Sequence, residues 1–188
     1  MANSTLLRDQ RDVSRLAQLQ RDSECVSEAF WRQVASGRGV AWSGRTVATA
    51  LSSLSKLAGQ GGTGRRVAAI EGVQRTLLLA AQEHAADMDA RGVANALNAV
   101  VKLQRTGAWH VPANSCGALF QASEGNAADM NAHDVANTWN ALSGLNIPPS
   151  ETLQSELLRA TERVLPSSTA QGVANTWNAL SGLDIPPG

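Results

Sequence analysis

The chain has 188 residues, of which 43% are hydrophobic and 4% aromatic, and its 16 basic residues balance its 16 acidic residues. This is enough apolar material for a buried core, and the zero net charge does not favour a strongly anionic partner. Cys25 and Cys116 are too few and too far apart for a disulfide framework or a zinc site. No apolar run is long enough to cross a membrane, and the N-terminus lacks the apolar block of a signal peptide. We therefore expect a soluble protein, cytoplasmic in the producing cell.

The charge is distributed unevenly along the chain. Residues 1–105 contain 14 basic and nine acidic residues, whereas residues 106–188 contain two basic and seven acidic residues. The first part therefore carries a net charge of +5 and the second a net charge of −5. Because affinity for nucleic acid depends on neutralising phosphates, this division counts against nucleic-acid binding by the C-terminal part.

Amphipathic periodicity and helix-stop signals predict nine helices and no strand. Residues 5–22 form a charged helix without the motif described below, and we expect this helix to cap the fold. The glycine-rich residues 58–64 are predicted to form a flexible loop, and residues 65–86 one long helix. The other helices are predicted over residues 24–36, 43–57, 89–103, 115–128, 132–145, 151–165 and 170–183.

One 15-residue stretch occurs twice, at residues 135–149 and 173–187, with a single difference between the copies. Looser copies begin at residues 47 and 93, so the motif recurs at spacings of 46, 42 and 38 residues. Self-similarity with this period indicates stacked helical hairpins. We therefore predict an all-α fold, an α-solenoid of about four repeats of 38–46 residues.

Each copy of the motif reads as the second helix of a hairpin. Apolar residues recur at i, i+4, i+7 and i+10, which places them on one side of a helix that we expect to be buried. The structural positions of the two best copies are Val135, Asn137, Trp139, Asn140 and Leu142, and Val173, Asn175, Trp177, Asn178 and Leu180. A residue able to cap the helix stands four positions before each leading valine, namely Ser43, Asp89, Asn131 and Thr169. Ser150 is the predicted cap of the helix over residues 151–165.

We treat residues 1–188 as a single solenoid that consists of a capping segment and four repeats. The capping segment comprises residues 1–23, and the repeats comprise residues 24–58, 59–110, 111–147 and 148–188. The sequence stops where the first helix of a further repeat would begin, so we expect a C-terminally truncated array. One side of the last helix should then be apolar and exposed, and the chain should self-associate through its C-terminal hairpin.

Two sets of residues resemble known repeat families. The sequences PPSE at residues 148–151 and ANTWNAL at residues 136–142 resemble the octotricopeptide-type helical repeat, which implies RNA binding in organelles. The sequences ANALNA at residues 94–99 and LSK at residues 54–56 resemble more closely the SKWP repeat of bacterial type III effectors, which is HEAT/armadillo-like. This resemblance implies a solenoid that a type III system translocates into a host cell, where it acts in virulence by binding. The resemblance covers residues 43–188.

No group of residues predicts catalysis, a metal site or a cofactor. Residues 59–64, followed by Arg65, imitate a phosphate-binding loop but lack its Lys and Ser/Thr and a preceding strand. His84, His110 and His133 lie in different repeats, without a partner at metal-ligand spacing. We therefore predict a protein that is not an enzyme, with no catalytic residues, no metal and no cofactor.

Two recurring residue types allow two interpretations each. Trp139 and Trp177 could stack on nucleic-acid bases, but their place on the apolar side favours the core. The recurring asparagines could contact a ligand, but we expect them to bond backbone groups between repeats. Residues that read a partner should instead differ between repeats, and this criterion selects Arg91, His133 and Gln171, with Lys56 and Lys102.

The predicted function is that of a non-enzymatic binding module that contacts another protein, as an effector or a fragment of one in a host cell. The neutral charge and the absence of a catalytic constellation favour it. The alternative is sequence-specific RNA binding, which the octotricopeptide resemblance implies. No contact with a membrane is predicted.

Overall fold

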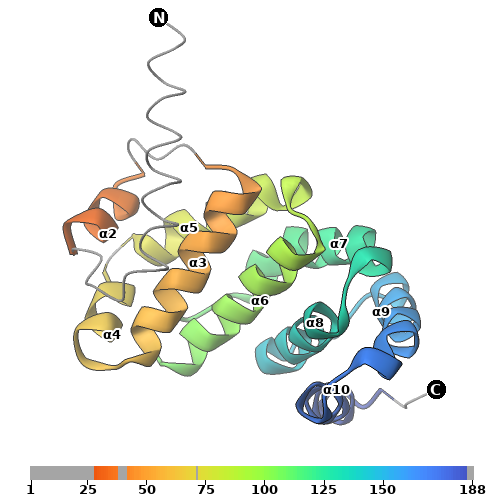
Figure 1. Cartoon of the computed structure of the whole chain (residues 1–188). Helices are drawn as coiled ribbons and strands as arrows, with labels where there is room; N and C mark the ends of the chain where they lie inside the picture. Colours follow the sequence, from red (N-terminus) through yellow and green to blue (C-terminus); the bar gives the residue numbers. More distant parts are fainter. Residues whose placement is uncertain (1–27, 38–41, 71, 186–188) are drawn as a thin grey trace, which may run out of the picture.

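The structure is a computed structural model and describes residues 28–37, 42–70 and 72–185. Within these ranges it is helical, with nine α-helices and no strand (Figure 1). The α-helices are α2 (Glu28–Ala35), α3 (Gly44–Gly59), α4 (Gly62–Ala68), α5 (Val73–His84), α6 (Ala90–Arg105), α7 (Gly117–Asn126), α8 (Ala132–Leu145), α9 (Glu151–Val164) and α10 (Ala170–Gly182). The all-α class is therefore confirmed for the described residues. The predicted capping helix over residues 5–22 lies outside them.

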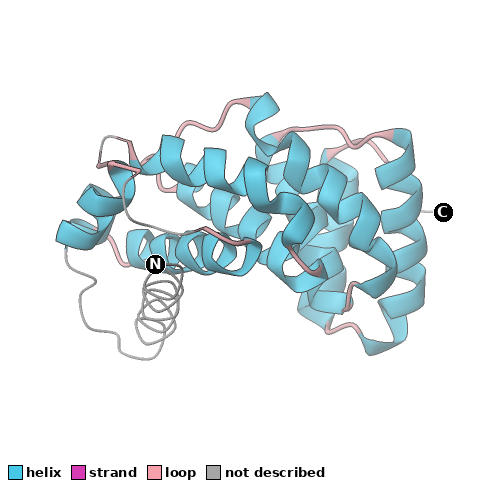
Figure 2. Ribbon diagram, turned by 90° about the horizontal axis from the view of Figure 1, so that it is seen from above, coloured by secondary structure: helices cyan, strands magenta, loops and turns pink. Residues whose placement is uncertain are grey.

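The helices form two layers that advance together along the chain (Figures 1 and 2). In one layer α3, α6, α8 and α10 lie side by side, each packed on the next. In the other layer α2, α5, α7 and α9 pack in the same order, while the short α4 packs on α3. We call the first of these the second-helix layer, because each of its members is the second helix of a predicted repeat. None of the described helices is long and apolar enough to cross a membrane.

Side-chain caps fix where the helices of the second-helix layer begin. Each of the four predicted cap residues accepts a hydrogen bond from the backbone N–H three residues later, which satisfies a donor that the helix leaves unpaired. The donor–acceptor distances are 3.3 Å for Ser43, 2.7 Å for Asp89, 3.1 Å for Asn131 and 3.1 Å for Thr169. Ser150 caps α9 in the same way, at 3.1 Å. All five predicted caps are confirmed.

The ends of α8 and α10 contain the one position at which the duplicated motif differs. Asn146 and Asp184 both adopt the left-handed conformation, with φ of 54° and 55°. The N–H of the following isoleucine donates to the carbonyl oxygen five residues earlier, at 2.9 Å and 3.0 Å respectively. Asn and Asp are the residues other than glycine that visit this conformation most readily, so the exchange preserves the helix end.

The prediction for residues 58–86 is wrong in two respects. Gly59 belongs to α3, and the glycines at 62 and 64 belong to α4, rather than to a flexible loop. The two helices approach closely here, because a Cβ on Gly64 would stand 1.8 Å from the carbonyl oxygen of Leu57. Glycine therefore permits this close approach of two helices. The predicted long helix is broken before α5 at Gly72, which has a φ of 87° and whose Cβ would lie 2.9 Å from the carbonyl oxygen of Ala35.

The core lies between the two layers and contains most of the predicted apolar side. In α8, Val135, Trp139 and Leu142 are at most 1% exposed. In α10 the counterpart of Leu142, Leu180, is buried, but Val173 and Trp177 are 40% and 58% exposed. The assignment to the core therefore holds for Trp139 and fails for Trp177. The same sequence has two environments because α8 is packed between neighbours of its own layer, whereas α10 is the last helix of the layer.

Candidate binding surface

A regular array of polar residues, with two glycines, covers the second-helix layer. In each helix the residues recur at i, i+4, i+7 and i+11, which places them on one side of the helix. We call this array the polar face. It comprises Arg45, Thr49, Ser52 and Lys56 of α3; Arg91, Asn95, Asn98 and Lys102 of α6; His133, Asn137, Asn140 and Gly144 of α8; and Gln171, Asn175, Asn178 and Gly182 of α10. Apart from Asn137, all of these residues are at least partly exposed.

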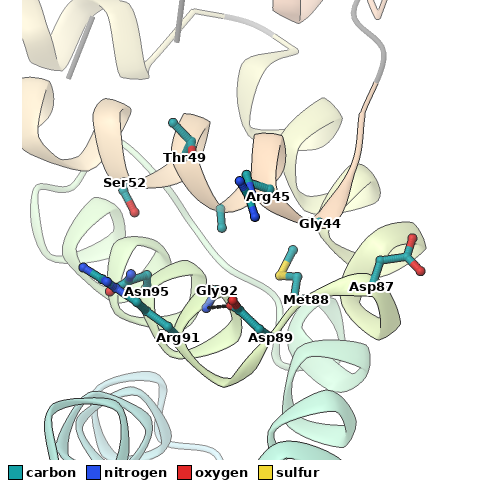
Figure 3. Close-up of a pocket in the computed structure, with 11 residues that line it drawn as sticks. Gly44, Arg45, Thr49, Ser52, Asp87, Met88, Asp89, Arg91, Gly92 and Asn95 are labelled. Carbon is teal, nitrogen blue, oxygen red and sulfur yellow. Dashed lines mark hydrogen bonds between the residues drawn. The ribbon is translucent and has the colours of Figure 1, made fainter. Parts of the chain in front are cut away.

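Two grooves open on the polar face at equivalent positions. Groove A, of about 520 Å³, lies between the N-terminal halves of α3 and α6 (Figure 3). Groove B, of about 430 Å³, lies between the N-terminal halves of α8 and α10. Small residues open both of them, since an alanine of one helix and a glycine of the next line each groove: Ala48 and Gly92 in groove A, and Ala136 and Gly172 in groove B.

Two arginines border groove A, one from each helix. Figure 3 shows Arg45 on α3 and Arg91 on α6. The two carboxylates of the groove are engaged or directed elsewhere: Asp89 Oδ1 accepts the N–H of Gly92 at 2.7 Å, and Asp87 is directed away from the arginines (Figure 3). Groove A therefore has two cations at its rim that form no salt bridge with its two carboxylates.

Groove B is lined by hydrogen-bonding side chains and by no Lys, Arg, Asp or Glu. Gln171 Nε2 donates to Asn175 Oδ1 at 2.9 Å, and His133 is exposed beside them. Asn137 is 9% exposed, and its Nδ2 has no hydrogen-bond partner in the described structure. A buried amide without a partner is uncommon in folded proteins. Groove B can therefore donate to and accept from a neutral polar ligand group.

A cation from α6 also reaches the part of the polar face on α8. Arg105 Nη2 donates to Asn140 Oδ1 at 3.2 Å. A Cβ on Gly144 would stand 3.0 Å from the same Nη2 and 2.7 Å from Val101 Cγ1. Glycine at position 144 therefore leaves room for the guanidinium group and lets α8 approach α6 closely.

Charge is separated between the two layers, and not only between the two halves of the sequence. Helices α3, α6, α8 and α10 contain five Lys or Arg residues and a single acidic residue, Asp134, which is 3% exposed. Helices α2, α5, α7 and α9 contain four arginines and six glutamates. No residue of the polar face is acidic. The acids that make the C-terminal half negative therefore lie largely outside this face.

Burial raises the pKa of the Asp134 carboxyl, against the backbone hydrogen bond from Asn131 and the positive charges of His133 and Arg91, which lower it. Asp134 Oδ2 accepts the N–H of Asn131 at 3.2 Å, while Oδ1 is buried without a partner. The one acid of the second-helix layer is therefore held in surroundings that disfavour its charge.

The five residues selected for their variation between repeats all lie on the polar face, and all are exposed. Arg91 lines groove A, and His133 and Gln171 line groove B. Lys56 and Lys102 lie nearer the C-terminal ends of α3 and α6 and line neither groove. The structure thus brings the predicted residues onto one surface, and their contact with a partner stays a prediction.

Sequence reasoning did not identify Arg45 or Arg105 as part of this surface. Arg45 stands two residues after its helix cap, as Arg91 does, so the register of the repeat would have found it. Arg105 lies beyond the recurring motif, and the sequence contains no signal for its bond to Asn140.

Within the part of the chain that the structure describes, the side chains of the recurring asparagines form no hydrogen bond with the backbone, contrary to our expectation. Asn140 accepts from Arg105, Asn175 accepts from Gln171, and the amide nitrogen of Asn137 has no partner. The expectation fails because these positions lie on the polar face, away from the caps and turns whose backbone groups are unpaired.

The other candidate residues, the histidines and cysteines, form no metal or nucleophilic site within the described residues. The described part of the chain contains no group of three or more His, Cys, Asp and Glu side chains that could hold a metal ion. His84 Nδ1 lies 3.6 Å from Asp87 Oδ2, and His110 is exposed elsewhere. Burial raises the pKa of the Cys116 thiol to about 11, so this thiol stays protonated in the core. Cys25 lies outside the described residues.

No protein-family model, curated protein or solved structure matches the chain. The role of the polar face is therefore inferred from its geometry and its charge.

Proposed function

We propose that the chain is an α-solenoid, a non-enzymatic helical-repeat module whose polar face binds single-stranded RNA. The separation of charge between the layers carries this proposal. The polar face has four cations and no acid, with Arg105 beside it, whereas the helices of the opposite layer contain six glutamates and four arginines. An RNA strand requires cations for its phosphates and neutral hydrogen-bonding groups for its bases, and the polar face combines the two.

The arrangement of the cations supports the same partner. Arg45 and Lys56 lie 11 residues apart on α3, as do Arg91 and Lys102 on α6, which corresponds to about 16 Å along each helix. Two rows of cations therefore flank a band of hydroxyl and amide side chains. None of these four cations forms a salt bridge with another described residue, so all four are available to phosphates.

The test compares cations of the two layers. Binding of a pool of single-stranded RNA is measured by fluorescence anisotropy at several salt concentrations. Replacing Arg45 and Arg91 with glutamine should weaken binding at least tenfold at low salt and reduce the slope of log K against log salt by about 1.4, since each phosphate contact contributes about 0.7.

The matched control is the double replacement of Arg75 and Arg159 with glutamine, because both arginines are exposed and lie in α5 and α9 of the opposite layer. This control has the same net charge and should bind nearly as the parent chain does. Equal losses in the two variants would mean that the polar face has no special part in binding.

A protein partner is the second candidate, as the effector resemblance implies, in which case the chain would act in a host cell after translocation. The exposed apolar residues of α10 favour it, because such side chains gather at protein contacts. Failure of the parent chain to bind the RNA pool at low salt would remove the RNA proposal and leave this one.

A further inference from the structure

The duplicated motif has the same sequence in α8 and α10 but is covered only in α8. Val135 and Trp139 are at most 1% exposed, whereas their counterparts Val173 and Trp177 are 40% and 58% exposed. Leu165, which follows α9, is 53% exposed. Three of the four large apolar side chains that are exposed in the described structure therefore lie on the last hairpin, and we call these three the outer patch.

The hairpin of α9 and α10 shows what covers this motif. Trp139 Nε1 donates to Thr161 Oγ1 of α9 at 3.0 Å. Helix α10 also packs against α8, and a Cβ on Gly182 of α10 would stand 3.0 Å from Ser143 Oγ of α8. A hydroxyl group in the first helix and a glycine in the second are therefore the features that fit a hairpin onto α8.

A charged side chain of α9 forms hydrogen bonds with the turn before α8. Arg163 Nη2 donates to the carbonyl oxygens of Ala127 and Met130, at 3.1 Å and 2.7 Å. The turn before α10 is built alike, with the N–H of Ser168 donating to the carbonyl oxygen of Leu165 at 3.1 Å. The last hairpin therefore presents outward the same apolar residues and the same kind of turn that α9 and α10 cover on the hairpin below.

We propose that the outer patch is a docking surface for another helical hairpin of the same chemistry as α9 and α10. The docked hairpin would carry a Ser or Thr opposite Trp177, an arginine two residues later for the carbonyl oxygens of Leu165 and Ser168, and a glycine opposite Ser181. Since α10 contains no charged residue, the hairpin covers it without burying a charge. The contact continues the packing of α6, α8 and α10 by one further step, and it does not depend on RNA binding.

The test supplies such a hairpin covalently. A copy of residues 150–185 is fused after Pro187, so that the existing Pro186 and Pro187 precede it as Pro148 and Pro149 precede α9. The counterpart of Trp177 in the added copy is phenylalanine, which keeps the number of tryptophans at five. We expect one cooperative unfolding transition with a midpoint raised by about 5 °C or more, and reduced quenching of tryptophan fluorescence by acrylamide.

Three variants identify the contact. Trp177→Asp should change the midpoint of the parent chain little but abolish the gain in the extended chain, because an aspartate cannot be buried beneath the added hairpin. Leu79→Asp, at a 53% exposed position on α5, is the matched control and should leave the gain intact. Replacing the counterpart of Gly182 in the added copy with leucine should also abolish the gain.

Some results would overturn the proposal. One is an extended chain whose added hairpin unfolds separately and leaves Trp177 open to acrylamide. Another is a gain in midpoint that survives Trp177→Asp, because the added hairpin would then be packed elsewhere. A parent chain that forms a discrete dimer with a shielded Trp177, and gains nothing from the extension, would show that the outer patch is built for a second copy instead.

Discussion

Trp139 of α8 and Thr161 of α9 are joined by a hydrogen bond of 3.0 Å from the indole Nε1 to Oγ1. The Thr161 hydroxyl in turn donates to the carbonyl oxygen of Leu157 at 2.7 Å, so it is satisfied both as a donor and as an acceptor. The pair connects helices of two successive predicted repeats. It also allows the largest side chain of the motif to be completely buried without an unpaired N–H group.

Trp139→Ala should therefore destabilise the fold much more than Trp177→Ala. The first removes a fully buried indole and leaves a cavity, which costs about 3–5 kcal/mol. The second removes a side chain that is 58% exposed and should cost about 1 kcal/mol or less. Urea unfolding followed by circular dichroism measures both free energies. Equal losses would show that α10 is covered in solution as fully as α8.

Gly144→Val tests whether the bond between Arg105 and Asn140 of α8 contributes to RNA binding. A branched side chain at position 144 meets Val101 Cγ1 and Arg105 Nη2, so it should displace the guanidinium from Asn140 and lower RNA affinity about threefold or more, as the loss of one phosphate contact does at low salt. The control is Gly125→Val on α7 of the opposite layer, where a Cβ would meet no atom within 4 Å. Thermal unfolding of both variants separates lost affinity from lost folding. An affinity that falls equally in both would deny Arg105 a part in binding.

The sequence predicted those features that depend on neighbours along the chain. The caps, such as Asp89 and Asn131, and the buried side of α8 follow from hydrogen-bonding residues and apolar spacing within one helix. Most features that depend on contacts between helices were missed, although the exposed apolar side of the last helix was predicted. Residues 135–145 and 173–183 are identical, so no local pattern could distinguish Trp139 from Trp177. Grooves A and B likewise exist only because small residues of neighbouring helices meet.

The charge argument against nucleic-acid binding by residues 106–188 stays a prediction, but it did not take account of where the charges lie in the fold. Summing charges over residues 106–188 mixes α9, with its three glutamates, with α8 and α10, which contain only the buried Asp134. The two helices of a hairpin face different sides of the molecule, so the relevant sum runs over a layer and not over a stretch of sequence.

Asp134→Asn should stabilise the protein at neutral pH. Burial raises the folded pKa of this carboxyl above its unfolded value, so its favourable contribution is complete only below the unfolded pKa and is lost as the pH rises through the folded pKa. The asparagine keeps an acceptor for the N–H of Asn131 and carries no charge at any pH. Urea unfolding at several pH values should give the variant the higher free energy of unfolding at pH 7. The difference from the parent chain should vanish below the ordinary carboxyl pKa of 3.8. A gain in stability that does not depend on pH would show that the substitution acts through packing and not through the charge of Asp134.

The chain itself should self-associate through the outer patch when no hairpin is supplied. Val173 and Trp177 leave an apolar surface on α10, and this helix has no charge that would repel a second copy. Light scattering should show an apparent mass that rises with protein concentration. Trp177→Asp should restore a monomer by placing a charge in the patch, whereas Leu79→Asp, at a position of similar exposure on α5, should not. Association that responds to Leu79→Asp and ignores Trp177→Asp would move the contact to the opposite layer and leave the outer patch without a role.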